Sequence, residues 1–204
     1  QPAILKMMAM GGEGSIIDRL KQLHIVPLTI SYEYDPCDYL KAREYQLRRD
    51  VPYWKKTAED DMESMLVGIK GFKGHIFYRC APCIDEWLDT VDAEQPKNKL
   101  FDEIAAHIDR EIHSNYELYP CNYVALDMIQ DTKVYEEYYT SEDYQKFDEY
   151  INEQIEKIDI ENRDDHFLRT CLLTQYAYPA KNYIAASSEN GRFKSLLNRL
   201  TFKK

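Results

Sequence analysis

The sequence lacks any apolar run long enough to span a membrane, and it has no surplus of positive charge. Its 204 residues carry 26 Lys and Arg against 36 Asp and Glu, which gives a formal net charge of -10 at pH 7. A protein that binds nucleic acid needs a basic face to neutralise phosphates, so nucleic acid is not an expected partner. The same acidic balance argues against broad attachment to an anionic membrane through this part of the chain.

The chain also lacks a disulfide framework and a secretory signal pattern. Its five cysteines are odd in number and scattered, at Cys37, Cys80, Cys83, Cys121 and Cys171. Such a set is typical of reduced thiols rather than of paired cystines. We therefore expect a cytoplasmic location, with peripheral contact to the inner membrane as an open option.

The sequence signatures of nucleophilic catalysis are absent as well. There is no Gly-x-Ser-x-Gly elbow and no Cys-Gly-Ser-Cys segment. Residues 11–14 are rich in glycine, but no strand precedes them and no Lys-Ser/Thr follows. A helix-breaking turn is therefore expected there rather than a phosphate-binding loop.

The Cys-x-x-Cys pair formed by Cys80 and Cys83 is the local motif closest to known chemistry. Two cysteines at this spacing can form a redox pair or half of a zinc site. A redox pair of the thioredoxin type needs a long helix after it, and a zinc site needs a second pair of ligands, for which Cys121 and His75 are poor candidates. We favour two small apolar positions at the end of a strand.

Histidines and acidic residues occur close together, but without the partners that a metal site needs. The His-x-Asp-x-Glu-x-His segment at 107–113 divides between two faces of one helix and has no matching ligands on another helix. The acidic run at 59–63 has the pattern of a solvated helix face. His24 and His75 stand at strand ends, where a structural role is expected, and residues 164–166 are expected to begin a helix. We predict no catalytic residue, no metal ligand and no cofactor within this chain.

The first half of the sequence alternates helical and strand patterns. Helices are predicted over 2–10, 15–23, 35–49 and 55–67, and strands over 25–32 and 75–80. Ser15 is the predicted N-cap of the second helix, and Asp35-Pro36 has the pattern that begins the third. The short apolar and β-branched run at 25–32 predicts a buried parallel strand.

From about Asn98 the sequence becomes helical, acidic and rich in tyrosine. Apolar residues at helical spacing between 100 and 112 predict one helix, and a capping box at 140–143 predicts the start of another. A further helix is predicted over about 163–178, closed by Pro179. We therefore divide the chain into residues 1–95, an α/β segment, and residues 96–204, a packed helical extension.

The segment from His24 to Pro36 carries a resemblance to a known family. It has the sequence His-Ile-Val-Pro-Leu-Thr-Ile-Ser-Tyr-Glu-Tyr-Asp-Pro and directly follows a helical segment. In this order the elements resemble the second half of the glycerolipid acyltransferase domain, of the glycerol-phosphate and lysophosphatidate acyltransferase type. The Ala-Pro-Cys-Ile segment at 81–84 is similar to the end of a later strand of that domain. The stretch from 109 to 127 resembles the carboxy-terminal extension of bacterial acyltransferases of the Bacteroides type.

The resemblance implies a fold class and an activity. The fold would be α/β, the carboxy-terminal part of an acyltransferase α/β domain followed by a mostly helical extension. The parent protein would move an acyl group from acyl-CoA or acyl-carrier protein to a glycerol-phosphate or lysophosphatidate acceptor in phospholipid synthesis. In that family the histidine of a His-x-x-x-x-Asp motif is the general base, and no histidine of this chain has aspartate five residues later. We expect that motif, and the Phe-Pro-Glu-Gly motif that holds the acceptor phosphate, to lie upstream, so that this chain alone is inactive.

Two residues are implied to line the substrate cleft. The family strand that matches residues 25–32 lies near the acyl chain, which gives Pro27 and Ser31 a shape-determining role outside catalysis. A plain core position is the alternative for each. The implied partners are acyl-CoA or acyl-carrier protein and a glycerophospholipid precursor.

Two functions of other classes stay open beside this one. The chain would be a non-catalytic helical interaction module if its acidic, tyrosine-rich half from Asn98 onward binds a basic partner. It would be a thiol-redox protein if Cys80 and Cys83 react as a pair.

Overall fold

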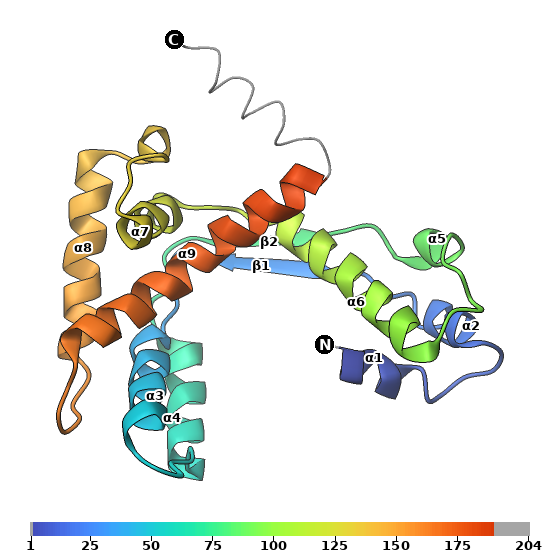
Figure 1. Cartoon of the computed structure of the whole chain (residues 1–204), viewed down its shortest axis with the longest axis horizontal. Helices are drawn as coiled ribbons and strands as arrows, with labels where there is room; N and C mark the ends of the chain where they lie inside the picture. Colours follow the sequence, from blue (N-terminus) through green and yellow to red (C-terminus); the bar gives the residue numbers. More distant parts are fainter. Residues whose placement is uncertain (1, 190–204) are drawn as a thin grey trace. The chain divides into compact units, whose positions relative to one another are not determined.

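The computed structural model describes residues 2–189 (Figure 1); Gln1 and residues 190–204, the last part of the predicted helical extension, lie outside this description. The described chain is mostly helical. Its α-helices are α1 (Pro2–Met8), α2 (Ile16–Lys21), α3 (Asp38–Asp50), α4 (Ala58–Lys70), α5 (Asp85–Leu88), α6 (Lys97–Ser114), α7 (Pro120–Gln130), α8 (Ser141–Glu156) and α9 (Asp165–Glu189). The strands are β1 (Leu28–Tyr32) and β2 (Ile76–Cys80), and η1 (Glu136–Tyr138) is a short 3-10 helix.

β1 and β2 pair as a two-stranded antiparallel ribbon. The N–H of Ala81 donates to the carbonyl of Pro27 at one end, and the N–H of Glu33 donates to the carbonyl of His75 at the other, each over 2.9 Å. Residue numbers therefore fall along one strand as they rise along the other. The prediction of a buried parallel strand at 25–32 is wrong, because an apolar β-branched run is common to both kinds of pairing and does not determine direction. The chain is a helix-rich fold with a small sheet.

Most predicted helices are confirmed, with shifted ends. The hydroxyl of Ser15 accepts the N–H of Asp18 (3.2 Å) at the start of α2, and the carboxylate of Asp18 accepts the N–H of Ser15 (2.9 Å). The predicted third helix begins later than expected, at the start of α3, because the side chain of Asp35 accepts the N–H of Cys37 (2.9 Å) and holds a turn there.

The prediction that Pro179 ends the last helix is wrong. Pro179 lies inside α9, which continues to Glu189. A proline removes one backbone hydrogen bond and normally breaks a helix. Here Tyr176, Ala177 and Ala180, on either side of it, are buried. We infer that packing of this stretch outweighs the lost hydrogen bond.

The chain forms two compact units, each built from segments distant in sequence. Among the described residues, unit 1 contains 2–30, 78–116 and 182–189, and unit 2 contains 31–77 and 117–181. Each unit thus combines segments from both sides of residue 95. The division into 1–95 and 96–204, which rests on composition and on the family resemblance, stays a prediction.

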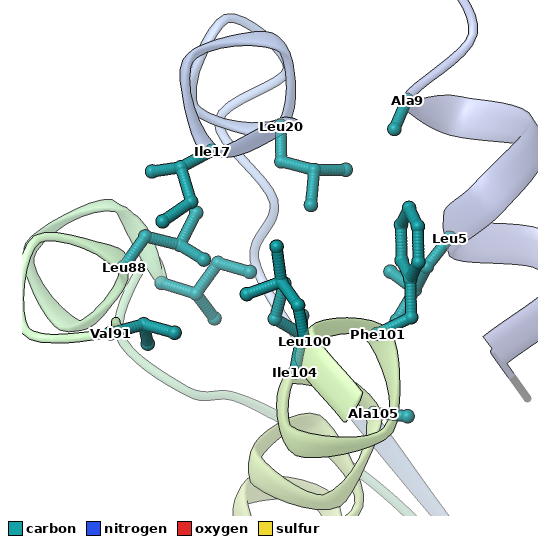
Figure 2. Close-up of a cluster of buried hydrophobic side chains, with 11 residues drawn as sticks. Leu5, Ala9, Ile17, Leu20, Leu88, Val91, Leu100, Phe101, Ile104 and Ala105 are labelled. Atoms are coloured by element: carbon teal, nitrogen blue, oxygen red, sulfur yellow. The ribbon is translucent and has the colours of Figure 1, made fainter. Parts of the chain in front are cut away.

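Unit 1 has a core of aliphatic side chains. Ile17 and Leu20 of α2 point toward Leu88 of α5 and Ile104 of α6 (Figure 2). The predicted apolar stripe of α6 supplies the central positions, and α1 packs beside it through Leu5. The short helices α1, α2 and α5 are too short to be stable alone, so this burial is what holds them.

The helices of unit 2 are held together by buried polar side chains as well as by apolar ones. Phe147 and Ile151 of α8 are fully buried, and α8 packs on α7 and α3. Gln46 of α3 is buried and donates to the carbonyl of Asn162 (3.0 Å), in the turn before α9. The carboxylate of Asp127 on α7 accepts hydrogen bonds from the chain that follows: Thr132 Oγ1 (2.7 Å), Val134 N (2.9 Å), Tyr135 N (3.0 Å) and Tyr139 Oη (3.0 Å).

Replacing Ile104 with alanine should lower the free energy of unfolding by about 2–5 kcal/mol, because it opens a cavity in the core of unit 1. Ile4 of α1 is 58% exposed, and Ile4→Ala is the matched control, expected to change stability by about 0.5 kcal/mol or less. Urea denaturation followed by circular dichroism measures both. Equal losses for the two variants would contradict the assigned core.

Candidate functional site

The two residues predicted to line a substrate cleft lie on the buried side of β1. Pro27, directly before β1, is buried. Its carbonyl accepts the N–H of Ala81, the residue after β2. Ser31 is 6% exposed, and its hydroxyl accepts the N–H of Glu117 (3.0 Å). Between them, Thr29 donates its hydroxyl to the carbonyl of Ile112 (3.0 Å). These polar atoms bind the backbone of neighbouring segments, and a role in substrate contact stays a prediction for Pro27 and Ser31.

The ribbon turns apolar side chains outward. Leu28 and Ile30 of β1 and Ile76 and Tyr78 of β2 are 39% to 59% exposed, while the alternating positions Thr29 and Ser31 are buried. An antiparallel ribbon with one solvated side normally buries its apolar residues and exposes its polar ones. In β1 the arrangement is the reverse, with apolar residues exposed and polar residues buried.

The segment after β2 is fixed against the segment before β1. Ala81 and Ile84 are buried, and the N–H of Ile84 donates to the carbonyl of Ile25 (3.0 Å). Cys80 is exposed and Cys83 is half-buried, and all five cysteines are free thiols. The short helix α5 begins at Asp85, so the long helix that a thioredoxin-type pair requires does not follow Cys83.

The other sequence candidates have local structural roles. His107 stacks on Trp87 with ring centroids 3.8 Å apart, and burial lowers its pKa. In the acidic run at 59–63, Asp60 caps α4 by accepting the N–H of Thr57 (2.9 Å). The prediction that residues 164–166 begin a helix is confirmed, because Asp164 accepts the N–H of Phe167 (3.0 Å) at the start of α9.

A buried carboxylate that the sequence did not single out lies at the centre of unit 2. Asp38, the first residue of α3, is 0% exposed. Its carboxylate accepts hydrogen bonds from Tyr39 N (2.6 Å), from Tyr150 Oη of α8 (2.7 Å) and from Tyr176 Oη of α9 (2.6 Å). The Tyr176 hydroxyl also accepts the N–H of Asp35 (3.1 Å).

The electrostatics of this cluster keep the tyrosines protonated. Burial raises the pKa of Asp38, while the hydrogen bonds from Tyr176, Tyr150 and Tyr39 act in the opposite direction. Burial also raises the pKa of Tyr150 and Tyr176, and the negative charge of Asp38 adds to the effect. Both hydroxyls therefore donate at any ordinary pH. Because Asp38 has no exposed surface, the cluster can position three helices but cannot reach a substrate.

No local sequence signal identifies this cluster. Tyr150 and Tyr176 lie 112 and 138 residues after Asp38, and the chain has 17 tyrosines. Only the packing of α3, α8 and α9 selects these residues among the other aspartates and tyrosines.

Comparison with protein-family models, with curated proteins and with solved structures gave no match. Within residues 2–189, no helix combines the length and the apolar character needed to cross a membrane.

Tyr176→Phe should lower the free energy of unfolding by about 1.5–3 kcal/mol, because it removes a hydrogen bond to a buried charged group. It also leaves the N–H of Asp35 without its acceptor. Tyr178, two residues later on α9, is 51% exposed, and Tyr178→Phe should change stability by about 0.5 kcal/mol or less. The comparison is made by chemical denaturation at pH 7. A loss from Tyr176→Phe no greater than from the control would show that Asp38 does not depend on this donor.

Proposed function

We propose that this chain is the carboxy-terminal portion of a glycerolipid O-acyltransferase. The parent enzyme would move an acyl group from acyl-CoA or acyl-carrier protein to a glycerol-phosphate or lysophosphatidate acceptor. The proposal rests on the Val-Pro-x-x-Ile strand pattern at residues 26–30 and on the order of the neighbouring elements. The catalytic histidine and aspartate would come from upstream of Gln1, where the histidine would take the proton of the acceptor hydroxyl as it attacks the thioester carbonyl.

One structural observation supports the proposal beside the sequence pattern, namely the exposed apolar residues of the ribbon. A two-stranded ribbon is marginal by itself in water, and here Leu28, Ile30 and Ile76 stay substantially exposed. This is the expected condition of strands that belong to a larger sheet or core. Upstream strands of an acyltransferase domain would supply the missing cover. In that arrangement Pro27 and Ser31 would shape the inner side of the cleft wall without touching the reacting atoms.

The activity test compares two lengths of chain. Residues 1–204 should not acylate glycerol 3-phosphate or lysophosphatidate with acyl-CoA or acyl-carrier protein as donor. The natural chain extended upstream should do so, and should lose the activity when the upstream histidine is replaced by alanine. Thioester-dependent acylation by residues 1–204 alone would overturn the claim that the catalytic residues lie upstream. An inactive extended chain without the histidine motif would overturn the acyltransferase proposal itself.

The double substitution Leu28→Thr/Ile30→Thr tests whether an upstream segment covers the ribbon. Threonine is β-branched and keeps the strand preference, so residues 1–204 should lose only about 0.5 kcal/mol. In the extended chain the same change should cost about 2 kcal/mol or more, since two buried apolar side chains would be lost. Thermal unfolding of both lengths gives the two differences. Equal effects in the two chains would show that nothing upstream packs on this side.

Helix α4 offers a surface for the peripheral membrane contact. Met62, Met65, Leu66 and Ile69 recur at i, i+3, i+4 and i+7 and are 53% to 76% exposed, and no residue of α4 is buried. An apolar stripe of this kind lies at the boundary between lipid headgroups and acyl chains in interfacial helices. Nearby acids are partly neutralised, because Asp61 pairs with Lys56 (3.0 Å).

The second candidate function, a non-catalytic helical interaction module, is favoured by the same stripe. In that case α4 would bind another protein, and the acidic, tyrosine-rich half would not be the only docking surface. The two candidates differ in what covers the stripe and in whether the extended chain has activity.

Vesicle flotation tests whether the apolar stripe of α4 binds a membrane surface or another protein. The chain should float with phosphatidylcholine vesicles, and Leu66→Glu/Ile69→Glu should abolish flotation because it places charges in the apolar stripe. Ile4→Glu/Met7→Glu, at two exposed apolar positions of α1, is the matched control and should float like the unchanged chain. Absence of flotation by the unchanged chain would leave the protein-docking function for α4.

A further inference from the structure

The loop before β1 and the segment after β2, up to the first residue of α5, bring three potential metal ligands together in unit 1. His24, Cys83 and Asp85 place a ring nitrogen, a thiol sulfur and a carboxylate oxygen within 4.8 Å of one another. His24 Nδ1 lies 2.6 Å from Asp85 Oδ2. This combination was not predicted, because His24 is far from the other two in sequence.

The environment of the second carboxylate oxygen of Asp85 supports a bound cation independently of the cluster. Oδ1 of Asp85 is buried and has no hydrogen-bond partner. A buried carboxylate oxygen without a partner is unfavourable, since its desolvation is not compensated. A cation bound at this carboxylate would remove that cost.

The backbone around the three residues is already fixed. Hydrogen bonds from Ala81 to Pro27 and from Ile84 to Ile25 hold the two loops against each other. His24 has a positive φ of 48°, a conformation that histidine adopts more often than most residues and that is unusual enough to suggest a constraint. The nearest competing cation, Lys21, is held by Asp89 (2.6 Å).

We propose that His24, Cys83 and Asp85 form a zinc site with an open fourth position. Zinc takes this mixture of nitrogen, sulfur and oxygen donors in tetrahedral geometry, with ligand atoms roughly 3.5 Å apart. In the structure the three ligand atoms lie within 4.8 Å of one another. The thiol of Cys83 loses its proton to solvent as the zinc–sulfur bond forms, and any proton between His24 and Asp85 is released as well.

The ion would tie the two loops that flank the ribbon. His24 precedes β1, and Cys83 and Asp85 follow β2, so binding would stabilise the folded chain relative to the unfolded one. The inference does not depend on the proposed acyltransferase function, because its readouts are metal binding and stability.

Metal-free protein is titrated with zinc in competition with a chromophoric chelator, and cobalt serves as a spectroscopic probe. One equivalent should bind, with a sulfur-to-cobalt charge-transfer band, and the unfolding midpoint should rise. Cys83→Ser, Asp85→Asn and His24→Asn should each weaken zinc binding by about 100-fold or more. Asparagine tolerates the positive φ at position 24, and circular dichroism confirms that each variant is folded.

The chain supplies a matched control. His75 Nδ1 lies 2.6 Å from Glu33 Oε2, an exposed histidine–carboxylate pair with the same separation but outside the three-ligand cluster. His75→Asn should leave zinc binding unchanged. Loss of binding on Cys80→Ser without loss on His24→Asn would place the metal at the Cys-x-x-Cys pair and overturn the proposal. Absence of stoichiometric binding by the unchanged protein would overturn it as well.

Discussion

The buried carboxylate of Asp38 is the constraint on which unit 2 depends. A carboxylate without water is costly unless several donors surround it, and here the donors come from the backbone of α3 and from side chains of α8 and α9. The three helices must therefore meet in one arrangement for the charge to be tolerated. Such a group adds less to stability than an apolar replacement would, but it penalises any packing in which Tyr150 or Tyr176 is displaced. Unit 1 has no comparable centre in its described residues and relies on the aliphatic core of Figure 2.

Two proposed functional features of the chain lie at the ribbon. The inner positions of β1, Thr29 and Ser31, are small and polar and bind neighbouring backbone, whereas its outer positions Leu28 and Ile30 are apolar. This distribution is typical of strands that other elements cover on both sides. The proposed acyltransferase domain would provide that cover. At the end of the same ribbon, His24 meets Cys83 and Asp85, so one short element connects the proposed cover and the proposed metal site.

Three acidic residues of the sequence take part in capping boxes at helix starts. Asp18, Asp60 and Asp143 each occupy the third position of a helix and accept hydrogen bonds from the capping residue. Those hydrogen bonds lower the pKa of all three carboxyls. The largest cause is the side-chain hydrogen bond with Ser15 at Asp18, and the backbone hydrogen bond with the capping threonine at Asp60 and Asp143. Negative charge at a helix start is also favoured by the helix dipole. These three acids stabilise the starts of α2, α4 and α8.

Local elements of this fold can be predicted from the amino-acid sequence. The N-cap at Ser15, the capping box at Thr140, the apolar stripe of α6 and the glycine-rich turn were predictable because each depends on residues within a few positions of one another. Four other features became known from the fold: the antiparallel pairing of β1, the continuation of α9 through Pro179, the burial of Asp38 and the approach of His24 to Cys83. The physical reason is that these features arise from contacts between residues far apart in the chain, whose energies outweigh local preference and leave no pattern in a single sequence.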